Sequence, residues 1–234
     1  MLTLKQILIL CLAIAVSACG KSQEEKRLEE NKQKQALEQK RIQAEKLAKE
    51  KEAKIMVKEL SFDPDTVKFQ KVNGYCGEMN TKNKLGAYVG YRRYMISNFG
   101  EDNEKQAFVA GMSVSDNPRL DEIVNFEFEQ KWLVECEGLK INKSANLEQC
   151  SKESMTAFMV SDFYLKFSES ASFKDIKNVL LENHDNDEKK NIINILNELR
   201  NMDKKGNAQM LANPKDFSKD YGLAKYKACV QEQG

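Results

Sequence analysis

The chain has 234 residues, and its 37 lysine and arginine residues are balanced by 36 aspartate and glutamate residues. This balance gives no reason to expect a nucleic acid as partner, because proteins that bind one usually carry a basic surface. The length allows one large domain or two small ones.

Residues 1–18 have the composition of a secretory signal peptide. Lys5 precedes an apolar run from Ile7 to Val16, and the small residues Ser17 and Ala18 follow it. The run is shorter than the about 20 residues that a transmembrane helix needs. We therefore expect this segment to be removed during export.

The end of this segment, Val16-Ser17-Ala18-Cys19, resembles a lipobox, the site at which bacterial lipoproteins are acylated on cysteine and cleaved before it. The resemblance implies that Cys19 carries acyl chains such as palmitate, and two or more chains make release from a bilayer negligible. Gly20 resembles the residue after the cysteine in lipoproteins sent to the outer membrane, which implies the periplasmic side of that membrane, whereas Lys21-Ser22 resembles a signal for retention in the inner membrane. An ordinary signal peptide with a chance cysteine is the alternative.

Residues 19–58 predict a lipidated N-terminus followed by a charged helical stalk. From residue 21 to 58 there are 12 basic and 8 acidic residues and no Gly or Pro, a composition that favours helix. A single helix of this length would span about 57 Å and act as a spacer. A partly disordered linker and a coiled coil with a partner are alternatives. The large apolar residues do not sustain the heptads that a coiled coil needs: Leu28, Leu37, Ile42, Leu47 and Ile55.

Residues 59–140 predict a small α+β module. Asp63 and Pro64 predict a short helix, as N-cap and first helical residue. The remaining pattern predicts a three-stranded antiparallel sheet with one helix packed on one face. The expected strands are 67–80, 87–96 and 106–113, and the expected helix is 121–136 and carries Trp132.

Parts of this module resemble a small uncharacterised family of bacterial envelope and prophage proteins. The similar segments are Asp63–Phe69, Cys76–Asn83 and Gly86–Tyr91, followed by a helix with Trp132 and Cys136. The resemblance implies a shared fold and supports a disulfide between Cys76 and Cys136. It implies no activity, although it suggests that the protein could be a prophage-derived factor that excludes superinfecting phages.

Four cysteines remain once Cys11 leaves with the signal peptide and Cys19 is acylated: Cys76, Cys136, Cys150 and Cys229. An even number in an oxidising compartment predicts two disulfides, for which three pairings exist. We prefer Cys76 with Cys136 and Cys150 with Cys229, because each bridge then closes one module. The spacing lacks CxxC and zinc-ligand patterns, so we expect structural bridges and no metal.

Residues 148–234 predict an all-helical module. Apolar residues recur at helical spacing, and Ser172 and Pro214 are typical first residues of helices. The expected helices are 149–167, 172–181, 187–202 and 214–231.

A mixture of aromatic, guanidinium and polar groups in the α+β module predicts a binding surface. Its residues are Glu78, Asn80, Tyr88, Tyr91, Arg92 and Tyr94. The competing interpretation, which we favour, is that tyrosines and arginines of a sheet pack as cross-strand pairs.

The sequence offers little support for catalysis. His184 is the only histidine, and it lies in a polar stretch that we interpret as a solvated helix cap. Glu127 and Glu129 are two residues apart on a predicted helix, so they do not form the facing pair of a glycosidase. We therefore expect no catalytic residues and no cofactor.

The sequence as a whole predicts an α+β protein with a helical stalk, a small sheet with a packed helix, and a helical module. The leading hypothesis is a lipid-anchored, non-enzymatic protein that binds an envelope protein or peptidoglycan. An envelope hydrolase, or an inhibitor of lysozyme-type hydrolases, is the alternative.

Overall fold

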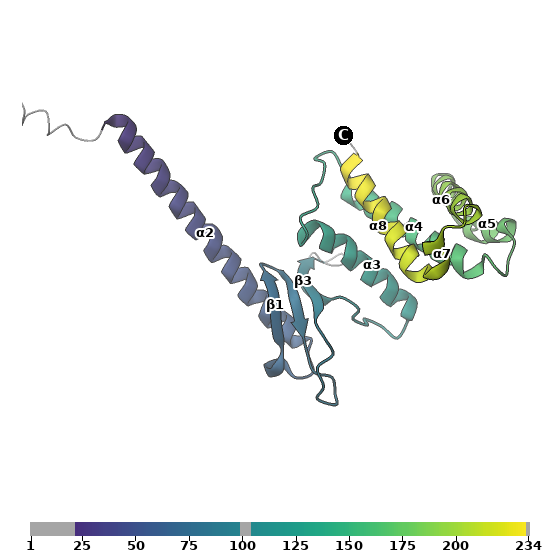
Figure 1. The fold of residues 1–234 in the computed structure, drawn as a ribbon, viewed down its shortest axis with the longest axis horizontal. Helices are drawn as coiled ribbons and strands as arrows, with labels where there is room; N and C mark the ends of the chain where they lie inside the picture. The colour runs from purple at the N-terminus through teal and green to yellow at the C-terminus, as the bar shows by residue number, and fades with distance from the viewer. Residues whose placement is uncertain (1–21, 99–103, 233–234) are drawn as a thin grey trace, which may run out of the picture. The chain divides into compact units, whose positions relative to one another are not determined.

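The computed structural model describes residues 22–98 and 104–232, and the chain divides into two compact units at Lys51 and Glu52. The fold is α+β (Figure 1). The proposed signal peptide, the lipobox and Cys19 lie outside the described residues. No helix in the described part of the chain is long and apolar enough to cross a bilayer.

Helix α2 (Gln23–Glu59) is the helix that the charged composition predicts. Ser22 caps its start, since its Oγ accepts a hydrogen bond from the backbone N–H of Glu25. The five large apolar residues in it that failed to form heptads are all exposed. In the last two turns of α2, however, two other apolar residues, Ala53 and Val57, are fully buried.

The sheet has four antiparallel strands in the order β1-β2-β3-β4, one more than predicted. They are β1 (Lys68–Asn73), β2 (Cys76–Asn80), β3 (Arg92–Asn98) and β4 (Lys105–Val109). The short helix η1 (Pro64–Thr66) precedes them at the predicted place, but the Asp63 side chain does not cap it.

Three predicted strand boundaries are wrong for backbone reasons. The expected strand 106–113 ends at Val109, shortly before Gly111, which has φ +71°. The expected strand 67–80 is a hairpin, because Gly74 and Tyr75 form a two-residue turn between the paired residues Asn73 and Cys76, with Gly74 at φ +61°. Glycine at the first position of a two-residue hairpin turn is a signal that the sequence prediction missed. The expected strand 87–96 begins only at Arg92, because Gly90 has φ +95°, outside the strand region.

Both faces of the sheet are covered, each by a different helix. Tyr94 of β3 is fully buried on the face where it packs with Val57 from the end of α2. The next residue, Met95, packs on the opposite face with Phe128 of α3 (Pro118–Glu135). The sequence predicted the covering of the sheet by α3 but not the covering by the end of α2, which belongs to the compact unit that begins at Glu52.

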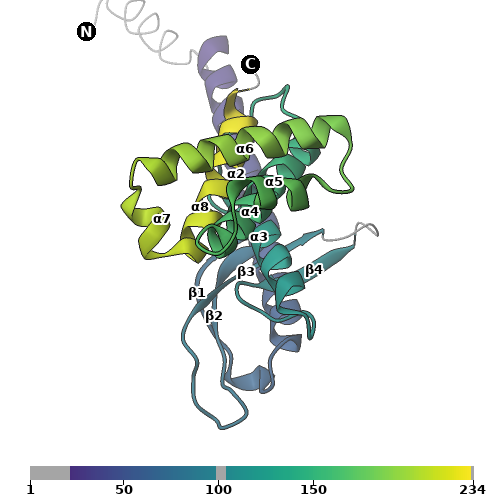
Figure 2. The same ribbon diagram turned by 90° about the vertical axis from the view of Figure 1, so that its right-hand side faces the viewer.

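The helical part contains α4 (Leu147–Phe167), α5 (Phe173–Leu181), α6 (Asn186–Lys204), α7 (Ala208–Ala212) and α8 (Pro214–Glu232). Four of these helices were predicted, and α7 was not. Figure 2 shows α6 running across α4 and α8. Ser172 caps α5 as predicted, accepting a hydrogen bond from the N–H of Asp175.

The disulfides join Cys76 to Cys136 and Cys150 to Cys229, which is the preferred pairing. The first ties β2 to the end of α3, and the second ties the first turn of α4 to the last turns of α8. They close loops of 60 and 79 residues. Loops of this length correspond to about 4 kcal/mol of stabilisation in the chain-entropy model.

Candidate functional site

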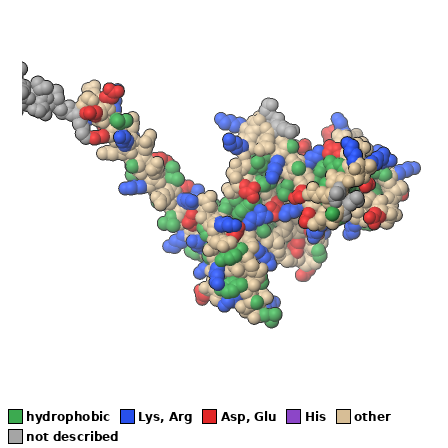
Figure 3. Space-filling model, viewed as in Figure 1, with side chains coloured by type: hydrophobic (Ala, Val, Ile, Leu, Met, Phe, Trp, Pro, Cys, Tyr) green, Lys and Arg blue, Asp and Glu red, His purple; other side chains and the backbone are tan. Residues whose placement is uncertain are grey.

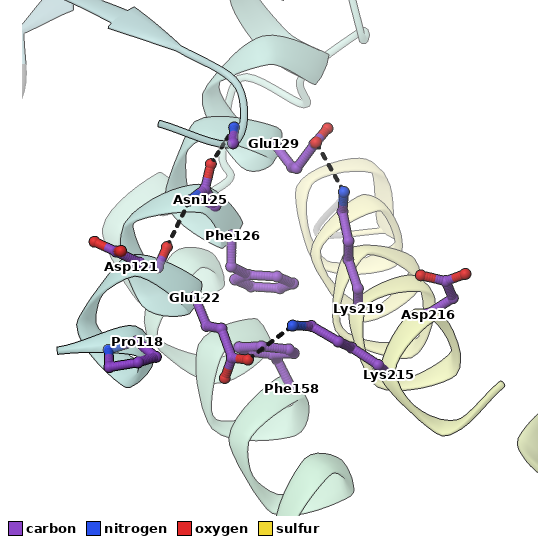
Figure 4. A pocket seen from close by; sticks show the side chains of 11 residues that line it. Pro118, Asp121, Glu122, Asn125, Phe126, Glu129, Phe158, Lys215, Asp216 and Lys219 are labelled. Atoms are coloured by element: carbon purple, nitrogen blue, oxygen red, sulfur yellow. Dashed lines mark hydrogen bonds and ion pairs between the residues drawn. The ribbon is translucent and has the colours of Figure 1, made fainter. Parts of the chain in front are cut away.

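The candidate functional site is a cleft of about 410 Å³, a volume typical of ligand sites. Helix α3 forms one wall, α8 forms the other, and α4 contributes to the floor (Figure 4). The residues that line it are Gly111, Pro118, Asp121, Glu122, Asn125, Phe126, Glu129, Phe158, Lys215, Asp216 and Lys219.

Two stacked phenylalanines make the apolar floor of the cleft. Phe126 of α3 and Phe158 of α4 have ring centroids 4.6 Å apart and nearly parallel planes. Helix α8 approaches them closely because Gly222 has no side chain. A Cβ at this position would lie 2.6 Å from Cζ of Phe126 and 2.9 Å from Cβ of Phe158.

Charged side chains on the two walls pair across the cleft (Figure 4). Nζ of Lys215 lies 3.0 Å from Oε1 of Glu122, whose other oxygen accepts a hydrogen bond from Arg119 at 3.1 Å. Burial favours a higher pKa for Glu122, but the hydrogen bonds from Lys215 and Arg119 outweigh burial and hold this pKa below its ordinary value. Glu122 is therefore a carboxylate at neutral pH.

Glu129 is the most buried acid of the cleft, with its side chain 11% exposed. Its Oε1 accepts hydrogen bonds from Arg93 of β3 at 2.6 Å and from Lys219 of α8 at 2.8 Å. The guanidinium of Arg93 also lies over the ring of Trp132, 5.1 Å from its centroid. Glu129 thus links the sheet, α3 and α8 through one carboxylate oxygen.

The rim of the cleft is ordered by hydrogen bonds from α3 to the loop before it. Asp121 accepts hydrogen bonds from the hydroxyl of Ser113 and from the backbone N–H groups of Val114 and Ser115, and these bonds lower its pKa. Oδ1 of Asn125 accepts a hydrogen bond from the N–H of Gly111 at 2.6 Å. The rim is therefore preorganised.

This arrangement suits binding better than proton transfer. A general acid at neutral pH needs a raised carboxyl pKa, whereas the pKa values of Glu122 and Asp121 are both lowered. Charges of both signs over an aromatic floor match a ligand that is itself charged and partly apolar. In the described residues, no group of three or more His, Cys, Asp or Glu side chains is placed to hold a metal ion.

The structure distributes the six predicted binding residues over different places. Tyr94 is fully buried in the core. Glu78 lies beside β1, where Lys71 and Gln70 hold its carboxylate and lower its pKa. These two residues face opposite sides of the sheet, since Tyr94 pairs with Gly77 and Glu78 pairs with Arg93.

The other four predicted residues lie near the β2–β3 connection. Asn80 Oδ1 accepts a hydrogen bond from the N–H of Gly90, and Tyr88 donates one to the carbonyl of Thr66. Tyr91 and Arg92 are exposed, and Arg92 lines a second hollow of about 250 Å³. Most of the six residues therefore have structural contacts, and the six do not form one surface.

His184 lies where the sequence predicted it, beside a helix cap. Asp185 caps α6, accepting a hydrogen bond from the N–H of Glu188 at 2.8 Å. Nδ1 of His184 lies 2.9 Å from Oε2 of Glu188. The other carboxylate oxygen of Glu188 is paired with Lys152 of α4. The histidine thus lies beside a surface ion pair between Lys152 and Glu188 at the α4–α6 junction.

The cleft was missed because its walls come from two distant helices. Glu122, Phe126 and Glu129 are spaced by four and three, so they share one helical face, and Lys215 and Lys219 share another. The two patterns are complementary in charge. Sequence reasoning considered Glu129 only as a partner for Glu127 and did not compare the helices.

Comparisons with models of protein families, with curated protein sequences and with solved structures find no significant match to this chain. The resemblance to envelope and prophage proteins therefore stays a prediction.

Proposed function

We propose that the protein is a bacterial lipoprotein, anchored through Cys19 on the periplasmic side of the outer membrane, that binds an envelope protein or a cell-wall component in the cleft between α3, α4 and α8. The lipobox resemblance supports the lipid anchor, and the paired cysteines support an oxidising compartment such as the periplasm. Helix α2 is the spacer, because its large apolar side chains are exposed.

The cleft is the observation that carries the binding role. Two of its acids are already paired with its lysines, Glu122 with Lys215 and Glu129 with Lys219, and they lie beside stacked aromatic rings. A charged ligand can replace one partner of such a carboxylate–lysine pair with a charged group of its own, and no side chain has to gain or lose a proton. A peptide or a charged cell-wall segment has this chemistry.

Lipidation is tested by metabolic labelling with palmitate and by mass spectrometry of the purified protein. We expect the label on the wild type and on Cys11→Ala, whose cysteine leaves with the signal peptide. Cys19→Ala should take up no label. A free amino terminus at Cys19 without added hydrocarbon would contradict the proposed anchor.

Binding in the cleft is tested by crosslinking in intact envelopes, followed by purification of the protein and by sedimentation with peptidoglycan. Lys215→Glu reverses a charge on a side chain that is 76% exposed, and it should reduce recovery of the ligand about tenfold, the effect of losing one charged contact. The matched control is Lys174→Glu at an exposed site on α5. Equal recovery with both variants would refute the cleft as the site.

A further inference from the structure

The end of the sheet that holds the β2–β3 connection presents an unusual number of exposed apolar side chains. Figure 3 shows hydrophobic side chains at the lowest point of the sheet module, where this connection lies in Figure 1. We call this surface the apolar tip, and it consists of Leu60, Phe62, Leu85, Tyr88, Val89 and Tyr91. Leu85 is 91% exposed and Phe62 is 71% exposed, so these two side chains protrude.

The loop that carries Leu85 is held in a fixed shape. Oδ1 of Asn83 accepts hydrogen bonds from the N–H groups of Leu85 and Ala87, and the N–H of Asn83 donates to the carbonyl of Ala87. Farther from the turn, where the two arms of the loop meet, the N–H of Val89 donates to the carbonyl of Thr81. Leu85 is thus presented by an ordered turn, and little entropy is lost when it is buried by a partner.

The apolar tip is continuous with the segment that follows α2. A hollow of about 250 Å³ is lined by Leu60, Val89 and Met112 together, and Nζ of Lys82 lies 3.9 Å from Asp63. Leu60 and Phe62 therefore belong to the same surface as the loop.

The charges of this loop indicate the kind of partner. Residues 81–92 contain Lys82, Lys84 and Arg92 and no acidic residue, and the adjoining residues 60–66 contain Asp63 and Asp65, so the two segments together keep a net charge of +1. Protruding apolar side chains flanked by lysines match an anionic lipid surface, because the apolar groups enter the acyl region while the ammonium groups stay among the headgroups. A protein partner would instead require a concave surface shaped to Leu85.

We propose that the apolar tip is a membrane-contact site that inserts Leu85 into an anionic phospholipid bilayer. This contact is separate from the lipid at Cys19. A protein anchored in one lipid surface then has a second means of holding lipid.

The test uses the full chain, reconstituted into vesicles of phosphatidylcholine. A chain that carries no acyl group is tested by its own cosedimentation with vesicles that contain phosphatidylglycerol, so the test does not depend on lipidation. Fluorescent, protein-free vesicles that contain phosphatidylglycerol are added, and their capture is measured. We expect capture of these vesicles, weaker at high salt, and little capture of pure phosphatidylcholine vesicles.

Leu85→Glu should reduce the capture about tenfold, since it replaces an inserted side chain by a charge. Val179→Glu is the matched control, because Val179 is 56% exposed on α5 and lies outside the apolar tip. Far-UV circular dichroism checks that both variants are folded. Absence of capture by the wild type, or equal capture by Leu85→Glu, overturns the proposal and would leave a protein partner as the occupant of the apolar tip.

Discussion

Single residues decide how closely the elements of the folded unit approach one another. Gly77 lies opposite Tyr94, and a Cβ on Gly77 would lie 2.6 Å from the tyrosine Oη. Gly222 has the same role between α8 and the phenylalanines of the cleft. These glycines are required by close approach and not by backbone dihedral angles.

Gly222→Ala should destabilise the protein although alanine favours helix. In a free helix this change would gain about 1 kcal/mol, but here the added methyl group meets Phe126 and Phe158. Overpacking of this kind costs about 1–3 kcal/mol, so we expect a net loss in the free energy of unfolding, measured in urea. The loss should shrink in a Phe126→Leu background, and an unchanged or raised stability in the wild-type background would contradict the contact.

At the scale of the elements, helix α2 packs against the rest of the fold only at its end. Helix α2 is exposed along most of its length, but its end covers one face of the sheet with Ala53 and Val57. The two residues are four apart and therefore share a helical face. The same helix thus serves two purposes, and only its end belongs to the core.

Val57→Ala should lower the free energy of unfolding by about 1–3 kcal/mol, because it removes buried methyl groups and leaves a cavity. Ile55→Ala is the matched control on the same helix, since Ile55 is 53% exposed. It should change the stability by less than about 0.5 kcal/mol. Chemical denaturation of the two variants side by side measures the difference, and equal effects would mean that the end of α2 does not pack on the sheet.

The contact between α6 and α8 predicts a dependence of stability on pH. Oε2 of Glu198 accepts a hydrogen bond from Tyr221 at 2.6 Å and lies 2.7 Å from Nζ of Lys225. Burial acts to raise the pKa of Glu198, but these two partners outweigh it and lower the pKa. A carboxyl group whose pKa is lowered by folding stabilises the native state above its ordinary pKa of 4.5, and this stabilisation is lost as the pH falls through the lowered value.

Glu198→Gln should therefore reduce the loss of stability between about pH 5 and pH 3, because the group no longer takes up a proton. Urea midpoints at several pH values measure this loss. Glu169→Gln, at an exposed position after α4, is the control and should leave the loss of stability at acid pH as it is in the wild type. If Glu198→Gln and the wild type lose stability in parallel, Glu198 does not contribute to the acid response.

Sequence reasoning succeeded where the signal is local. The composition predicted α2, and the residues Ser172 and Pro214 predicted helix starts. The two disulfides join distant residues, but they were selected because local patterns had already divided the chain into modules that each bridge could close. It failed where two distant segments meet. The covering of the sheet by Val57 and the cleft between Glu122 and Lys215 depend on packing that no local pattern contains.

At the scale of the whole molecule, local stability should differ sharply between the two compact units. In the described residues up to Lys51 almost all side chains are exposed, and an isolated charged helix is marginal in water. The residues from Glu52 onward share cores and two disulfides. We expect amide hydrogen exchange to be fast in residues 23–51 and slow, with similar opening free energies, in β3 and α4.

Hydrogen exchange followed by mass spectrometry of peptides checks this expectation. Strong protection in residues 23–51 would contradict it and would indicate that the helix pairs with another chain. In that case, protection should fall when the protein is diluted.

The bridge between Cys150 and Cys229 encloses α5, α6 and α7. The segment from Glu182 to Asp185 within this loop is exposed and forms the turn between two helices, so it is a natural place for a protease to cut. A single cut there would break the backbone, but the two fragments would stay joined by the disulfide between Cys150 and Cys229. The clipped protein should migrate as one band without reductant and as two bands with it, and such a nick would release no fragment while the disulfide is intact.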